Sequence, residues 1–231
     1  MHYTGVLGGF YTVADWVYKF FFVNIIWFFF NLPIVFLLFN LLIADSLAVI
    51  IGLCCLIFAI LPFVFYPSIM ALFSVVNQFI HKNEISIFRD YCSFFKENYK
   101  KSMKLGTIFT IFWAIFFIDF FYMLDIKNTS LIYLFLIIGF FGFIYQLQVF
   151  SGAIYMKGKL RSIWKHVAIL MFGHPFLSMS LGLISSIYLY VMIEWFAFLL
   201  PIFSGSILVF FSLLVFLKIY RTEERGAGTK E

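Results

Sequence analysis

The sequence predicts an all-α integral membrane protein with six transmembrane helices, two cytoplasmic amphipathic helices and both termini in the cytoplasm. Three observations predict this fold: a very apolar composition, six apolar segments of spanning length, and basic residues gathered in alternate connections. Of the 231 residues, 64% are hydrophobic and 12% are charged, with 36 Phe and 13 Tyr. Soluble domains average roughly 45–50% apolar and about 25% charged residues. This composition therefore excludes a water-soluble globular domain and a disordered chain.

Six segments have the length of about 20 mostly apolar residues that a spanning helix requires. We expect these spans at residues 20–43, 47–66, 105–124, 131–156, 176–193 and 196–219. Proline removes a backbone donor, so helix kinks or breaks are expected at Pro33, Pro62, Pro67 and Pro201. Pro67 is also expected to begin a separate helix that carries residues 71–73 out of the bilayer.

Basic residues predict the orientation of these spans. Of the 16 Lys and Arg residues, 15 lie in segments that an even number of spans places on one side. They are Lys19, six residues within 82–104, four within 157–165, and four from Lys218 onwards; Lys127 alone lies on the other side. Because cytoplasmic connections carry the excess of Lys and Arg, both termini are expected inside. Positive charge spread along membrane edges also argues against a nucleic-acid-binding module, because anionic lipid headgroups attract it there.

Residues 86–104 have mixed polarity and are expected to form a cytoplasmic amphipathic helix. At 100° per residue, one face is aromatic and its flank is basic, which suits a helix that lies flat on the membrane or docks on a partner. Both interpretations remain open. The candidate docking residues are Phe88, Tyr91, Phe95, Lys96, Asn98, Tyr99 and Lys100.

Residues 159–172 form a second, shorter amphipathic pattern. Its apolar stripe comprises Leu160, Ile163, Trp164, Val167 and Met171. Residues 173–175, Gly-His-Pro, are expected to end this helix before the fifth span. The last residues, 221–231, are expected to form a cytoplasmic tail.

Polar groups inside spans are costly and are therefore candidates for function. The candidates here are Asn24, Asn31, Asp119 and Gln146. Asn24 and Asn31 are seven residues apart and face one side of their helix, whereas Gln146 and Gln148 point to different faces. Asp119 lies about 7.5 Å from the end of its span, which suits an interfacial anchor or an ion site. Hydrogen bonds between helices account for such amides, and a transport pathway is the alternative.

The nucleophiles and metal ligands of the sequence do not form a catalytic signature. The four histidines are scattered, without an H-E-x-x-H pair, and neither G-x-S-x-G nor G-x-x-x-x-G-K-[ST] occurs. The three cysteines, Cys54, Cys55 and Cys92, lack metal-ligand spacing and are expected to be reduced. We therefore expect no enzyme activity, no cofactor and no metal.

Several short motifs run along the first half of the chain. They are Gly8-Gly9-Phe10-Tyr11, Trp16, Asn24, Trp27, Pro33, Pro67, Ala71-Leu72-Phe73, Glu84, Ile87-Phe88-Arg89, and Phe95-Lys96-Glu97-Asn98 followed by Ser102. His174-Pro175 and Pro201 continue the pattern more loosely. On these residues the sequence resembles the YesL-like family of bacterial membrane proteins. It departs from the family at Cys92, where a Trp is expected.

The resemblance implies a six-span plasma-membrane protein of unassigned activity. Members are often encoded beside carbohydrate ABC importers and glycoside-degrading enzymes in Gram-positive bacteria. This implies a non-catalytic accessory subunit of oligosaccharide uptake that contacts the lipid bilayer and the importer's permease subunits. Neither basic connection contains the E-A-A-x-x-x-G pattern of a permease coupling loop, so we do not expect the chain to be the driven pore.

Two other functions stay open. One is an independent small-solute transporter or channel lined by Asn24, Asn31, Asp119, Gln146 and Gln148. The other is a membrane-stress sensor that uses the basic helices to report on lipid state. The oligomeric state and the substrate are not predicted.

Overall fold

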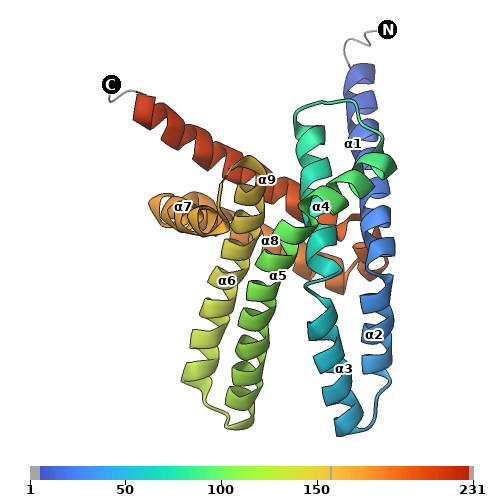
Figure 1. Cartoon of the computed structure of the whole chain (residues 1–231), viewed down its shortest axis with the longest axis vertical. Helices are drawn as coiled ribbons and strands as arrows, with labels where there is room; N and C mark the ends of the chain where they lie inside the picture. Colours follow the sequence, from blue (N-terminus) through green and yellow to red (C-terminus); the bar gives the residue numbers. More distant parts are fainter. Residues whose placement is uncertain (1–5, 157, 229–231) are drawn as a thin grey trace.

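A computed structural model describes residues 6–156 and 158–228 of the chain. In these ranges the backbone is helical, with short connections (Figure 1). The elements are α1 (Val6–Phe30), α2 (Leu32–Leu42), α3 (Leu47–Ile60), α4 (Phe65–Ile80), α5 (Ile87–Asp125), α6 (Thr129–Tyr155), α7 (Leu160–Gly173), α8 (Pro175–Glu194), the 3₁₀ turn η1 (Ala197–Leu199) and α9 (Leu200–Gly228).

The predicted all-helical fold with several apolar helices of spanning length is confirmed. Within the described residues, five helices are long and apolar enough to cross a bilayer: parts of α1 and α9, and the whole of α5, α6 and α8. The number rises to six if α3 and α4, which are bent by 44° at their junction, form one broken span. The count of six spans and the orientation of the termini stay predictions.

The first predicted span, residues 20–43, is not one helix. Helix α1 begins at Val6 and ends at Phe30, and α2 starts after a break at Asn31 with Pro33 in its first turn. Proline fits the first turn of a helix, where its missing N–H has no partner in any case. The backbone N–H of Asn31 lies 3.0 Å from the carbonyl of Phe28, which tightens the last turn of α1. The kink expected at Pro33 is thus confirmed, but the apolar segment Gly9–Phe30 is the part of this region long enough to span.

The second predicted span, residues 47–66, is also broken. Helix α3 ends at Ile60, and α4 begins at Phe65, so the interruption surrounds Pro62 as expected. Pro67 lies within the first turn of α4. The separate helix predicted near Pro67 is confirmed, with its start two residues earlier.

Helix α5 joins two elements that were expected to be separate. Its 39 residues include both the amphipathic segment 86–104, except for its N-cap Ser86, and the third span at 105–124. Figure 1 shows that the first part of α5 runs obliquely. The helix then changes direction and continues beside α6. Ser102 Oγ lies 2.8 Å from the carbonyl of Asn98 and 3.0 Å from that of Tyr99. Such serine-to-backbone bonds bend helices, so the amphipathic segment is a bent extension of the span.

The later helices agree more closely with the sequence. Helix α7 lies within a residue of the predicted 159–172, and α8 begins at Pro175. Helix α9 continues to Gly228, so the expected tail at 221–231 begins as helix. Residues 229–231 of that tail, which include the basic Lys230, and Lys157 lie outside the described residues.

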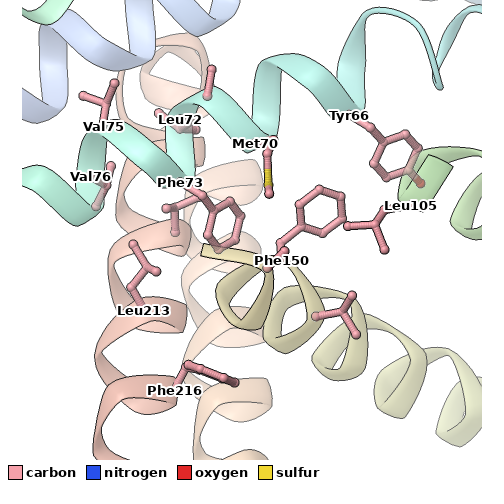
Figure 2. Packing of buried hydrophobic residues seen from close by; sticks show 14 of the residues in the cluster. Tyr66, Met70, Leu72, Phe73, Val75, Val76, Leu105, Phe150, Leu213 and Phe216 are labelled. Atoms are coloured by element: carbon pink, nitrogen blue, oxygen red, sulfur yellow. The ribbon is translucent and has the colours of Figure 1, made fainter. Parts of the chain in front are cut away.

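Helix α4 forms the centre of the molecule. It packs against α1, α5, α6 and α9, and residues 70–73 are almost completely buried. Figure 2 shows Met70 and Phe73 of α4 beside Phe150 of α6, with Leu213 of α9 close by. The ring centroids of Phe73 and Phe150 are 5.8 Å apart. The bundle is therefore built around α4, and the α2–α3 hairpin extends away from it (Figure 1).

Candidate functional site

The predicted docking face on α5 is only partly exposed. Phe88 is 65% exposed, and Lys96 and Lys100 are also exposed. Phe95, Asn98 and Tyr99 are half-buried, and Tyr91 is completely buried. The prediction that Tyr91 belongs to a docking surface is therefore wrong, and the exposed part of the face is Phe88 with its basic neighbours.

Tyr91 faces inward because its ring and its hydroxyl both have partners inside the chain. The centroid of the Tyr91 ring lies 5.1 Å from that of Phe30 on α1. The ring of Phe95 lies 5.0 Å from the same Phe30 ring. The hydroxyl donates to the carbonyl of Ser68 at 2.8 Å and lies 2.7 Å from Ser68 Oγ. The aromatic face of this segment thus joins α5 to α1 and α4.

Asn31 extends the same hydrogen-bond network. Its side-chain Nδ2 donates to Ser68 Oγ at 3.0 Å and to the carbonyl of Trp27 at 2.7 Å. Since the Tyr91 hydroxyl proton goes to the Ser68 carbonyl, the Ser68 hydroxyl donates to Tyr91, and the chain of bonds has one consistent direction. Asn31 Oδ1 is buried and has no partner among the described residues. The network joins the break between α1 and α2 to the first turn of α4 and to α5.

Asn24 joins α1 to α9 by two hydrogen bonds. Its Nδ2 donates to the carbonyl of Pro201 at 2.9 Å, and its Oδ1 accepts from the backbone N–H of Ser206 at 2.8 Å. A Cβ atom added at Gly205 would lie 3.0 Å from Asn24 Oδ1, so the glycine allows the close approach. Asn31 lies just beyond the end of α1, and it bonds to a different helix from Asn24.

Gln146 and Gln148 point to different sides of α6, as predicted. Gln146 Oε1 accepts from the indole N–H of Trp113 on α5. Gln148 is completely buried and donates to Ser178 Oγ on α8 at 2.8 Å. Each amide therefore links α6 to a different neighbour.

Asp119 lies apart from the amides. It is exposed on α5, near the connection to α6, and neither ion pair found among the described residues involves it. The five residues proposed as a transport lining thus fall at separate places in the bundle. None of them lines the cavities described below.

A cavity of about 760 Å³ lies between the N-terminal half of α1 and the connection from α4 to α5. Its walls are amphipathic: Trp16 and Phe88 contribute aromatic rings, and Lys82 and Glu84 contribute opposite charges. The fixed charge pair Asp15–Lys19 also lines it, with 2.6 Å between Lys19 Nζ and the Asp15 carboxylate. Lys19 Nζ lies 5.8 Å from the ring centre of Phe79, which adds a cation–π contact.

Sequence reasoning missed this cavity and its charge pair. The signal was present, because Asp15 and Lys19 are four residues apart and therefore adjacent on one helix face. They are also the charged residues of the apolar segment Gly9–Phe30. A paired charge in such a segment is a candidate functional feature, and the cavity places it beside the exposed Phe88.

A smaller cavity of about 290 Å³ lies where α4, α5 and the end of α6 meet. It is lined by polar side chains from two of these helices, including Asn77, Glu97 and Asn98. Most of them already have partners: the Tyr155 hydroxyl donates to Asn77, and Asn98 donates to the carbonyl of Phe94 at 3.2 Å. Glu97 and Asn98 of the motif that resembles the YesL-like family therefore face this polar pocket.

No group of three or more His, Cys, Asp or Glu side chains placed to hold a metal occurs in the described part of the chain. Cys54, Cys55 and Cys92 are free thiols. His174 Nε2 lies 2.9 Å from a carboxylate oxygen of Glu223, which joins the start of α8 to α9.

Comparison with known proteins gives one match. Residues 20–120 match the family described as "Protein of unknown function, DUF624", a domain that the YesL-like proteins carry. The matched segment extends from α1 to α5 and contains Asn31, Ser68 and Tyr91 of the hydrogen-bond network. No curated protein and no solved structure matches the chain.

Proposed function

We propose that this chain is a non-catalytic accessory subunit of a carbohydrate uptake system in the plasma membrane, where it contacts the importer's permease subunits. The carbohydrate part of the proposal rests on the resemblance to the YesL-like proteins. The accessory part rests on one structural observation: the buried amide side chains are engaged in contacts between helices. Asn24, Asn31 and Gln146 each have partners on a neighbouring element.

This arrangement favours an accessory role over an independent transporter. A solute pathway requires polar side chains that face one shared cavity. Here Asn24 bonds to α9, Asn31 to α4 and Gln146 to α5. Removing these three amides from the candidate lining leaves Gln148, which bonds to α8, and Asp119, which is exposed. The amides stabilise the bundle through hydrogen bonds between helices.

Phe88 and the adjacent cavity form the contact surface in this proposal. Phe88 is exposed, and the cavity beside it offers aromatic rings with charges of both signs. Aromatic residues are enriched at the centre of protein interfaces. With both termini in the cytoplasm, this surface lies at the cytoplasmic edge of the membrane, where it meets the permease.

Affinity purification in mild detergent tests the proposal. Permease subunits should co-purify with the tagged chain from cells grown on glycans, and Phe88→Asp should reduce their recovery by about tenfold or more. Phe172→Asp is the matched control, because Phe172 is 77% exposed on α7 and lies outside the cavity. A chain that always isolates alone, or an equal loss in both variants, would refute the proposal.

A second measurement distinguishes the accessory role from an independent transporter. Vesicles that contain the purified chain alone should show no solute flux, and Asp119→Asn should behave as wild type. Flux through the isolated chain that Asp119→Asn abolishes would favour the transporter instead.

A further inference from the structure

A cluster of lysines surrounds a cavity at the junction of α5 with the α6–α7 connection. The cavity has a volume of about 480 Å³. Lys100, Lys101 and Lys104 line it from α5, and Lys159 lines it from the start of α7, together with Gly158 and Leu160. Two segments more than fifty residues apart in sequence thus bring four lysines around one space.

No carboxylate is among the described residues that line this cavity. The two ion pairs found in the described part of the chain, Asp15–Lys19 and His174–Glu223, lie elsewhere. Lys101 Nζ donates to the backbone carbonyl of Ala153 at the end of α6, which holds this side chain in place. Like charges gathered at short range repel one another, so the cluster favours a bound anion.

The position of the cluster indicates where the anion comes from. Lys104 is followed directly by Leu105 and the apolar remainder of α5. Ile108, one turn beyond Lys104 on the same side of the helix, is 48% exposed. Exposed apolar surface on the apolar part of α5 therefore lies one turn from the cavity, which suits a ligand with a charged head and an acyl chain.

We propose that Lys100, Lys104 and Lys159 bind the headgroup of an anionic phospholipid, beside Lys101, which is bonded to Ala153. The phosphate lies among Lys100, Lys104 and Lys159, and the acyl chains follow α5 past Ile108. Basic pockets between helices at the cytoplasmic side of a membrane are suited to such headgroups. This site is independent of the accessory role and of the cavity beside Phe88.

Native mass spectrometry of the full chain tests the site. Purified protein is offered an equimolar mixture of phosphatidylglycerol, phosphatidylethanolamine and phosphatidylcholine, and phosphatidylglycerol should be retained preferentially. The triple variant Lys100→Gln/Lys104→Gln/Lys159→Gln should reduce that retention by on the order of 100-fold, because three lysine contacts with the anionic headgroup are lost. Replacing the same three lysines by Arg should preserve it.

A matched triple variant controls for net charge. Lys82→Gln/Lys96→Gln/Lys165→Gln removes three exposed lysines that lie outside this cavity. Its retention of phosphatidylglycerol should stay within about twofold of wild type, since the headgroup contacts are intact. Equal loss in both triple variants would overturn the proposal, as would equal retention of the three lipids by the wild-type chain, a result that does not depend on either variant folding.

A third arm separates a lipid from a soluble anion. Glycerol 3-phosphate and inorganic phosphate, added in large excess, should not displace phosphatidylglycerol, because they lack the acyl chains. Complete displacement by either anion would identify the site as one for soluble phosphates and overturn the lipid assignment.

Discussion

Asn24 accepts a hydrogen bond of 2.8 Å from the backbone N–H of Ser206, a residue 182 positions further along the chain. The same side chain donates to Pro201, so one amide satisfies two backbone groups of α9. In the apolar interior of the bundle, unpaired backbone groups are costly. The first and last long helices of the described chain are thereby held together near its centre.

Asn24→Leu should lower the free energy of unfolding by about 1–2 kcal/mol, because both backbone partners on α9 lose their bonds. Thermal unfolding in detergent measures the change. Asn40→Leu is the control, since Asn40 lies on α2 and donates only to the carbonyl of Phe36 in its own helix. An equal effect at both positions would show that the contact with α9 has no special value.

Tyr91→Phe should destabilise the chain by about 1–2 kcal/mol, because the Ser68 carbonyl loses a donor and the Ser68 hydroxyl, which still accepts from Asn31, loses its acceptor. Tyr99→Phe, which removes a hydroxyl from a half-buried ring on the same helix, should have little effect. If the two variants unfold at the same temperature, the network of Asn31, Ser68 and Tyr91 does not stabilise the fold. In the double variant Ser68→Ala/Tyr91→Phe, the free energy of unfolding should fall by less than the sum of the losses in the two single variants, because the two residues share their hydrogen bonds.

Gly106→Ala should also be destabilising, since α4 and α5 approach each other closely at this residue. A Cβ atom at Gly106 would lie 2.5 Å from Cδ2 and 2.6 Å from Cβ of Tyr66, too close without a shift of one helix. Overpacking of this kind costs about 1–3 kcal/mol. Gly52→Ala on α3 has no atom within 4 Å and should leave stability unchanged or slightly raised.

Cysteine labelling should show on which side of the membrane each connection lies. Lys82 and Lys127 both have left-handed backbone conformations, with φ of 55° and 56°, so substitution by Cys perturbs the two connections similarly. After replacement of the native thiols, Lys127→Cys should react with an impermeant maleimide in intact cells. Lys82→Cys should react only after the cells are permeabilised. The reverse pattern would overturn the predicted orientation.

Sequence reasoning found the long apolar segments and the position of α7, because hydropathy and the Gly173-His174-Pro175 break are local signals. It placed the start of α1 too late. Asp15 and Lys19 interrupt the apolar run, yet they form an ion pair on one helix face and remain compatible with the membrane. Whether such charges pair depends on geometry that a hydropathy average does not contain.

The candidate sites were harder to predict for a similar reason. An aromatic helix face suits both lipid and a protein core, so periodicity could not show that Tyr91 turns inward to Ser68. The lysine cavity was invisible in the sequence, because Lys159 meets Lys100 and Lys104 only through the packing of separate segments. The amides Asn24 and Asn31 were expected on one side of a single helix, but α1 ends at Phe30 and their partners lie on different helices.

The unbroken course of α5 has a mechanical consequence. Its 39 residues extend about 58 Å at 1.5 Å per residue, whereas the hydrocarbon layer of a bilayer is about 30 Å thick. The length beyond this thickness corresponds to the amphipathic first part of α5, which is joined to the apolar part through the bend near Ser102. A displacement near Phe88 is therefore transmitted along one helix, through that bend, to the apolar part that ends at Asp125.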